Sequence, residues 1–186
     1  MRYNGETHGG CMEGCPDGQA SAYERLYMYN LVKEIKPLLS LECGTWKGGG
    51  STFSIHKALT EINDGKFHTF EVNQEFYESA ISKFPQKCQF IELHLQSFVD
   101  YASTLESESV DLVLVDSVDD PVLNKQVLLE TFRVLKPKGH ILIHDFPDYE
   151  DIQINEIEVV KDYLKNNFVF VNYLENTTGL MHCTKK

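Results

Sequence analysis

The stretch from Leu41 to Thr52, LECGTWKGGGST, decides the fold of this chain. Apolar residues lead into an acid and a glycine, three further glycines follow, and Ser51 and Thr52 then begin a helix-like pattern. This order predicts a strand, a tight loop and the start of a helix. Glycine lets a ligand approach the main chain without meeting a Cβ, and the first turn of a helix offers free N–H groups. The stretch therefore predicts a nucleotide-like ligand at the carboxyl end of the first strand of an α/β protein.

The spacing of the glycines excludes two common phosphate-binding loops. Thr45 and Trp46 follow Gly44, which breaks the dinucleotide fingerprint G-x-G-x-x-G, and no Gly-Lys-Ser/Thr follows. The pattern instead resembles motif I of class I S-adenosylmethionine-dependent methyltransferases. Glu-x-Gly-x-Trp-x-Gly-Gly is similar to the small-molecule O-methyltransferases related to the macrocin, catechol and caffeoyl-CoA enzymes. The resemblance implies S-adenosylmethionine as cofactor, contacted by residues of this loop: Glu42, Gly44, Thr45, Trp46, Gly48 and Gly49.

Beyond the loop, strand and helix patterns alternate to the end of the chain. The strands are predicted at 38–43, 67–72, 88–95, 110–116, 139–145, 168–174 and 179–184. The helices are predicted at 19–36, 50–61, 74–84 and 97–105, around 128–135, and around 157–164. Alternating βα units predict a Rossmann-like α/β fold. Its seven-stranded, mostly parallel sheet carries helices on both faces and ends in a C-terminal antiparallel β-hairpin. We expect one domain over 19–186, preceded by a flexible N-terminal arm over 1–18.

Composition narrows the partners. With 17 basic and 28 acidic residues, the formal net charge of −11 disfavours nucleic acids and anionic membranes. The chain has no apolar run of about 18 residues and no apolar signal core, and its five cysteines are scattered. We therefore expect a cytoplasmic protein with a small-molecule substrate. The sequence leaves a homodimer open.

Ligands of open α/β sheets bind at the carboxyl ends of the strands, so polar residues there are candidates for the site. Glu71 ends the second predicted strand and can accept hydrogen bonds from both ribose hydroxyls. Gln96 and Ser97 end the third, where the resemblance implies contact with the adenine. The hydroxyl of Ser97 suits a helix N-cap equally well.

Asp116 and Asp145 end the fourth and fifth predicted strands, and we expect their carboxylates to converge beside the cofactor. Two carboxylates can bind Mg²⁺, which would activate a substrate hydroxyl. The resemblance implies that both aspartates bind one metal ion. Where the related enzymes have a third metal ligand this chain has Phe146, and where they have a basic residue it has Asp119. Asp116, Asp145 and Asp119 are the candidate catalytic residues, and Asp116 also borders the cofactor.

Three histidines need separate interpretation. Adjacent residues of a strand point to opposite faces, so His144 is expected to pack under a helix if Asp145 faces the site. His68 and His94 show no pattern that pairs them, and we interpret them as structural or surface residues.

These observations together predict an S-adenosylmethionine-dependent methyltransferase that transfers a methyl group to a hydroxyl of a small molecule, with or without a divalent metal. Three alternatives remain open: a nicotinamide-dependent oxidoreductase, a non-catalytic nucleoside-binding protein of the same fold, and a member of the fold that methylates a protein.

Overall fold

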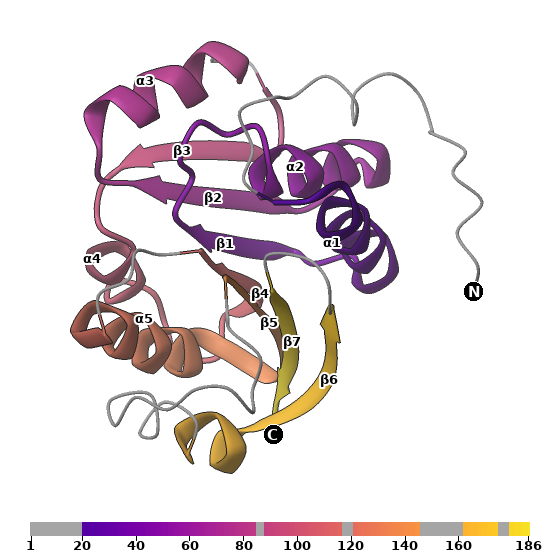
Figure 1. The fold of residues 1–186 in the computed structure, drawn as a ribbon, viewed down its shortest axis with the longest axis vertical. Helices are drawn as coiled ribbons and strands as arrows, with labels where there is room; N and C mark the ends of the chain where they lie inside the picture. The colour runs from indigo at the N-terminus through magenta and orange to yellow at the C-terminus, as the bar shows by residue number, and fades with distance from the viewer. Residues whose placement is uncertain (1–19, 85–87, 117–120, 146–161, 175–178) are drawn as a thin grey trace.

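A computed structural model describes residues 20–84, 88–116, 121–145, 162–174 and 179–186 of the chain. The described residues form an α/β fold around one seven-stranded sheet (Figure 1). The helices are α1 (Ala22–Ile35), α2 (Ser51–Ile62), α3 (Gln74–Lys83), α4 (Phe98–Ala102) and α5 (Pro121–Val134). The strands are β1 (Leu39–Cys43), β2 (Lys66–Glu71), β3 (Ile91–Leu95), β4 (Val110–Val115), β5 (Leu135–His144), β6 (Phe168–Leu174) and β7 (Leu180–Lys185).

The strand order is β3-β2-β1-β4-β5-β7-β6, which confirms the predicted architecture. Strands β1 to β5 pair in parallel, and β7 runs antiparallel to both β5 and β6. The order reverses at β1, where the chain first moves outward to β2 and β3 and later returns to β4 on the other side. Open α/β sheets bind ligands at such a reversal, outside the carboxyl ends of the strands.

The core has one layer on each face of the sheet because strand residues alternate in direction. Phe67 and Phe70 of β2, both almost fully buried, belong to opposite layers. One layer packs against α1 and α2, and the other against α4 and α5 (Figure 1).

Several predicted boundaries differ from the structure. Strand β3 begins at Ile91 rather than 88, and α4 is shorter than predicted at both ends. Leu135 was predicted on a helix but begins β5, where it pairs with Val110 of β4. Pairing with a neighbouring strand overrides the helical spacing here. The arm at 1–18 and most of the helix predicted around 157–164 lie outside the described residues; 162–167 is helical. In the part of the chain that is described, no helix is long and apolar enough to span a membrane.

Candidate cofactor and catalytic site

Glu42 lies beneath the glycine loop and is fully buried. Its Oε2 accepts hydrogen bonds from the hydroxyls of Thr52 on α2 and Thr69 on β2, both at 2.6 Å. The Thr69 hydroxyl also bonds that of Thr45 in the loop. The Glu42 carboxyl thus connects β1, β2, α2 and the loop. Its contact with a cofactor stays a prediction.

The electrostatics of Glu42 follow from this position. The pKa of Glu42 is raised to about 7. Burial is the largest cause and the charge of Asp116 acts in the same direction, while hydrogen bonds from Ser51, Thr52 and Thr69 lower the pKa. Its Oε1 atom is buried without a hydrogen-bond partner among the described residues. A buried, charged oxygen without a partner is costly, which is why burial favours the neutral form of this carboxyl.

Two glycines of the loop are required by close packing. Gly44 has φ +97°, and a Cβ there would lie 1.8 Å from the carbonyl oxygen of Asp116. Gly48 has φ +72°, and a Cβ there would lie 2.9 Å from the ring of Phe84 and 3.2 Å from Ala80 on α3. These conformations and distances exclude other residues. The glycines therefore hold the loop against β4 and α3, whether or not they also touch a ligand.

Glu71 joins the loop to the end of β2. Its Oε2 accepts the Trp46 N–H at 2.8 Å, and its Oε1 accepts the N–H groups of Val72 and Asn73, each at 2.9 Å. An ionised carboxylate has about four acceptor positions, so these three bonds leave capacity for a ligand hydroxyl. Glu71 is where the sequence predicts a ribose-binding acid, and its carboxylate is held firmly by the surrounding main chain.

The other residues predicted to contact the cofactor lie in the glycine loop and beyond the end of β3. The rings of Trp46 and Phe76 of α3 contact each other edge-on, with their centres 6.0 Å apart. The backbone of Trp46 has φ 46°. Gly49 is buried in the loop. Gln96 is exposed and its N–H donates to the Glu71 carbonyl at 3.0 Å. Ser97 is the N-cap residue of α4, as the alternative predicted, although its side chain makes no capping hydrogen bond.

At the ends of β4 and β5 the structure brings Asp116, His144 and Asp145 together. His144 Nδ1 lies 3.1 Å from Asp116 Oδ1 and 3.4 Å from Asp145 Oδ1, and His144 Nε2 lies 3.5 Å from Glu24 of α1. The side chains of His144 and Glu24 are fully buried, while those of Asp116 and Asp145 are 23% and 49% exposed. Asp119 lies outside the described residues. The predicted convergence of the two aspartates is therefore present, with an imidazole ring between them.

The charge of His144 decides what this group offers. Burial lowers the pKa of the ring, but hydrogen bonds to Asp116 and Glu24 and the charges of Asp116 and Asp145 outweigh burial and raise the pKa to about 10. The ring is thus a cation at neutral pH and cannot act as a general base there. Asp116, His144 and Asp145 each offer a ligand atom, and these atoms lie within 4.8 Å of one another, so the group could hold a metal ion. Metal binding at Asp116 and Asp145 stays a prediction.

The sequence did not predict that Glu24 contacts His144, or that His144 contacts Asp116. His144 does pack under a helix, as expected, but it also faces Asp116. The pairing of Val115 with Ile143 explains why, because the next residues, Asp116 and His144, are neighbours on one face. Asp145 follows the end of β5 with φ 52°, so the alternation of a strand no longer governs its direction. The position of His144 beside Asp116 could therefore be predicted only from the register of β4 against β5.

Comparison with known proteins agrees with this geometry. Residues 41–146, more than half of the chain, match a family model described as a methyltransferase domain. The chain belongs to this methyltransferase family. This membership confirms the resemblance noted in the glycine loop. Among curated proteins, no sequence matches the chain.

Solved structures share the fold of this methyltransferase at low identity. The O-methyltransferase TomG from Streptomyces achromogenes, in complex with S-adenosylmethionine, is 21% identical with a TM-score of 0.70, over 92% of this chain and 83% of TomG. The methyltransferase PaMTH1 from Podospora anserina, bound to S-adenosylhomocysteine, is 17% identical with a TM-score of 0.67, over 90% and 80%. A methyltransferase from Geobacter sulfurreducens is 12% identical with a TM-score of 0.65, over 88% and 78%. At these identities the likeness shows the fold alone.

Proposed function

We propose that this methyltransferase uses S-adenosylmethionine to methylate a hydroxyl of a small molecule. The observation that carries the proposal is the Glu71 carboxylate, which is buried at the end of β2 and bonded to the N–H of Trp46 in the glycine loop. An acid in this position suits the ribose of a nucleoside cofactor. The cofactors named in the TomG and PaMTH1 structures support the choice of S-adenosylmethionine.

The residues of the site suggest how the cofactor is held. Glu71 would accept hydrogen bonds from the ribose, and the main chain of Gly44, Thr45 and Gly49 would border the remainder. Gln96 and Ser97 lie beyond the end of β3, beside the proposed adenine position. When bound, S-adenosylmethionine supplies an electrophilic methyl group. Methyl transfer then requires alignment of donor and acceptor and exclusion of water more than an elaborate set of catalytic groups.

The chain's own acid–base chemistry centres on Asp116. The buried imidazolium of His144 orients the Asp116 carboxylate from one side. The Asp116 side chain is partly exposed, so a substrate can reach it from the other side. Asp116 would accept the hydrogen bond of the acceptor hydroxyl and take up its proton. Asp145 lies within reach of the same imidazolium and would complete the acidic border of the acceptor site. No step of this proposal requires a metal ion.

Titration calorimetry with S-adenosylhomocysteine tests the cofactor. We expect the wild-type protein to bind, Glu71→Ala to lose at least tenfold in affinity, and the control Glu78→Ala, at an exposed position of α3, to bind like wild type. No binding to the wild type would overturn the proposal and direct the search to nicotinamide cofactors.

A radiolabelled methyl-transfer assay tests the reaction. A panel of phenols, alcohols, amines and a protein extract distinguishes the acceptors. We expect transfer to a hydroxyl compound that Asp116→Asn reduces strongly with little change in S-adenosylhomocysteine affinity. If a chelator abolishes transfer and Mg²⁺ restores it, the predicted metal role of Asp116 and Asp145 is correct and the metal-free proton transfer is wrong. Cofactor binding without transfer to any acceptor would favour a non-catalytic protein.

A further inference from the structure

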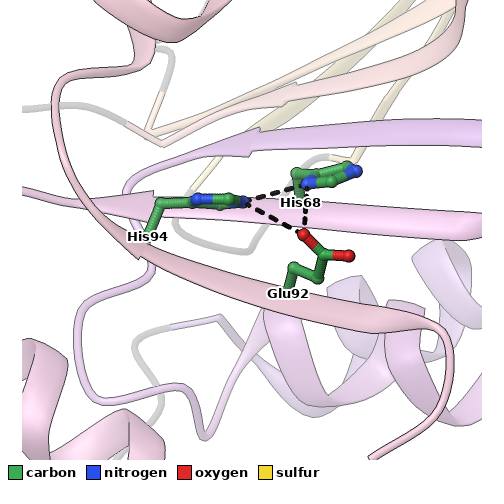
Figure 2. A group of neighbouring side chains, drawn as sticks. All are labelled: His68, Glu92 and His94. Carbon is green, nitrogen blue, oxygen red and sulfur yellow. Dashed lines mark hydrogen bonds and ion pairs between the residues drawn. The ribbon is translucent and has the colours of Figure 1, made fainter.

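His68, Glu92 and His94 form a cluster of neighbouring side chains (Figure 2). His68 pairs with Leu41 of β1, and Glu42, the next residue of β1, points to the opposite face of the sheet. His68 lies on β2 directly opposite Glu92 on β3, and His94 follows Glu92 by two residues, so all three side chains share a face. This face is the one that packs against α4 and α5, because Phe70 of β2 belongs to that layer. The cluster therefore lies outside the proposed cofactor site.

The spacing of the donor atoms suits a single metal ion. His68 Nδ1 and His94 Nε2 are 2.9 Å apart, and Glu92 Oε2 lies 3.6 Å from the former and 4.0 Å from the latter. Two ligands of a tetrahedral ion with bonds of about 2.0–2.1 Å are separated by roughly 3.3 Å. The three distances bracket this separation. To reach this separation the two ring nitrogens must move apart by about 0.4 Å, and the Glu92 carboxylate, whose side chain is 65% exposed, must approach them by about 0.3 and 0.7 Å.

Both imidazoles are prepared to bind a cation. Burial lowers the pKa of His68 and of His94, and the charge of Glu92 opposes this effect. Neutral imidazole is the form that binds metals. The His94 ring stacks on Phe70 at 4.9 Å, and Tyr101 of α4 lies 5.4 Å from the ring of His68. Aromatic contacts thus fix the direction of the two rings, which reduces the entropy lost on binding.

We propose that His68, Glu92 and His94 form a binding site for Zn²⁺, with a fourth coordination position open to solvent. Two imidazole nitrogens and one carboxylate oxygen are a ligand set typical of zinc and unsuited to Mg²⁺ or Ca²⁺, which prefer oxygen. On binding, the ring that donates the hydrogen bond between the two histidines would shift that proton to its own outer nitrogen (His68 Nε2 or His94 Nδ1), while the other ring already carries its proton on its outer nitrogen. The exposed carboxylate gives the ion a route from solvent.

The site would link the edge strand β3 to β2. His68 lies three residues before Glu71, a separation of about 10 Å along a strand. Bound Zn²⁺ would therefore stabilise the part of the sheet that carries the proposed ribose-binding acid. This inference does not depend on the proposed reaction, because the cluster belongs to the other face.

Calorimetry and thermal unfolding with Zn²⁺ test the site on the full chain. We expect the wild-type protein to bind Zn²⁺ with a micromolar or lower Kd and to unfold at a higher temperature when Zn²⁺ is present. Glu92→Gln, at an exposed position that tolerates the change, and His94→Ala should each weaken this binding by tenfold or more. In spectra of protein labelled with ¹⁵N-histidine, Zn²⁺ should shift the ring signals of His68 and His94.

His140→Ala is a matched control. His140 and His182 make the same 2.9 Å contact between β5 and β7, yet no carboxylate completes a metal-binding group with them among the residues that the structure describes. We expect this variant to bind Zn²⁺ like wild type. The proposal fails if wild type binds no Zn²⁺ at micromolar concentration. It also fails if Glu92→Gln and His94→Ala both retain wild-type affinity, which would assign the ion to other histidines or cysteines.

Discussion

The protonation of Glu42 makes the stability of this protein depend on pH in an unusual direction. Most carboxylates in folded proteins stabilise the fold more as pH rises, because partners favour their charged form. For Glu42, burial raises the pKa from 4.5 to about 7. The folded state therefore binds the proton more tightly than the unfolded state. This contribution to stability is fully present below pH 4.5 and is lost as pH rises through 7.

The magnitude follows from the shift. The rise of the pKa from 4.5 to about 7 corresponds to about 3 kcal/mol in the free energy of unfolding. By the same linkage, about 2–3 kcal/mol of this is lost between pH 5 and pH 8. Glu42→Gln keeps the size of the side chain and cannot titrate. The difference in stability between wild type and Glu42→Gln should therefore fall by about 2–3 kcal/mol over that range, with wild type relatively more stable at pH 5.

Urea unfolding of both proteins at pH 5, 6, 7 and 8 measures this difference, and effects of all other groups cancel in the comparison. Glu78→Gln, at an exposed position of α3, is the control and should follow wild type within experimental error. A difference that stays constant across the four pH values would refute the reasoning, since it would mean that Glu42 is ionised alike in both states. A difference that grows with pH would show that its hydrogen bonds outweigh its burial.

Three further perturbations are expected to act through named contacts. Gly44→Ala should destabilise the fold by more than about 3 kcal/mol or prevent folding, because its Cβ would meet the Asp116 carbonyl; a normal urea midpoint would contradict this. His144→Phe should cost about 3–5 kcal/mol, since it removes the imidazolium that contacts the buried Glu24 carboxylate; adding Glu24→Gln should recover part of this loss in thermal unfolding, and no recovery would argue against the ion pair. Glu71→Gln should lower the free energy of unfolding by about 1–3 kcal/mol and weaken S-adenosylhomocysteine binding, because the N–H₂ group of the new amide would face a backbone N–H donor. Unchanged affinity in calorimetry would contradict the assignment of Glu71 to the ribose.

Much of the fold could be predicted from the sequence because its signals are local. The alternation of strands and helices and the closing hairpin determine the sheet, and the acids at strand ends identify Glu71, Asp116 and Asp145. Directions of side chains were harder to predict. The Glu42 carboxyl lies beneath the loop and accepts hydrogen bonds from Thr52 and Thr69, two contacts that the sequence did not indicate.

Contacts between distant segments depend on register, which no local pattern reveals. His68 and His94 are far apart in sequence and meet because β2 and β3 pair with His68 opposite Glu92. Glu24 reaches His144 because α1 packs over the end of β5. Its place in a capping box with Ser21 gives a complete local explanation for the residue, so a reader of the sequence has no reason to expect a second role.

The four acids at the strand ends differ in what they can do, and their exposure separates them. Glu42 is sealed beneath the loop by hydroxyl groups, and Glu71 is buried and occupied by backbone N–H groups, so both maintain the shape of the loop. Asp116 and Asp145 are partly exposed, and their inner sides meet an imidazolium. A substrate can therefore reach the aspartates without displacing main-chain contacts, whereas proton transfer to Glu42 or Glu71 would disturb the loop itself. The division of roles proposed for this methyltransferase, with the glutamates shaping the cofactor site and the aspartates facing the acceptor, follows from these partners.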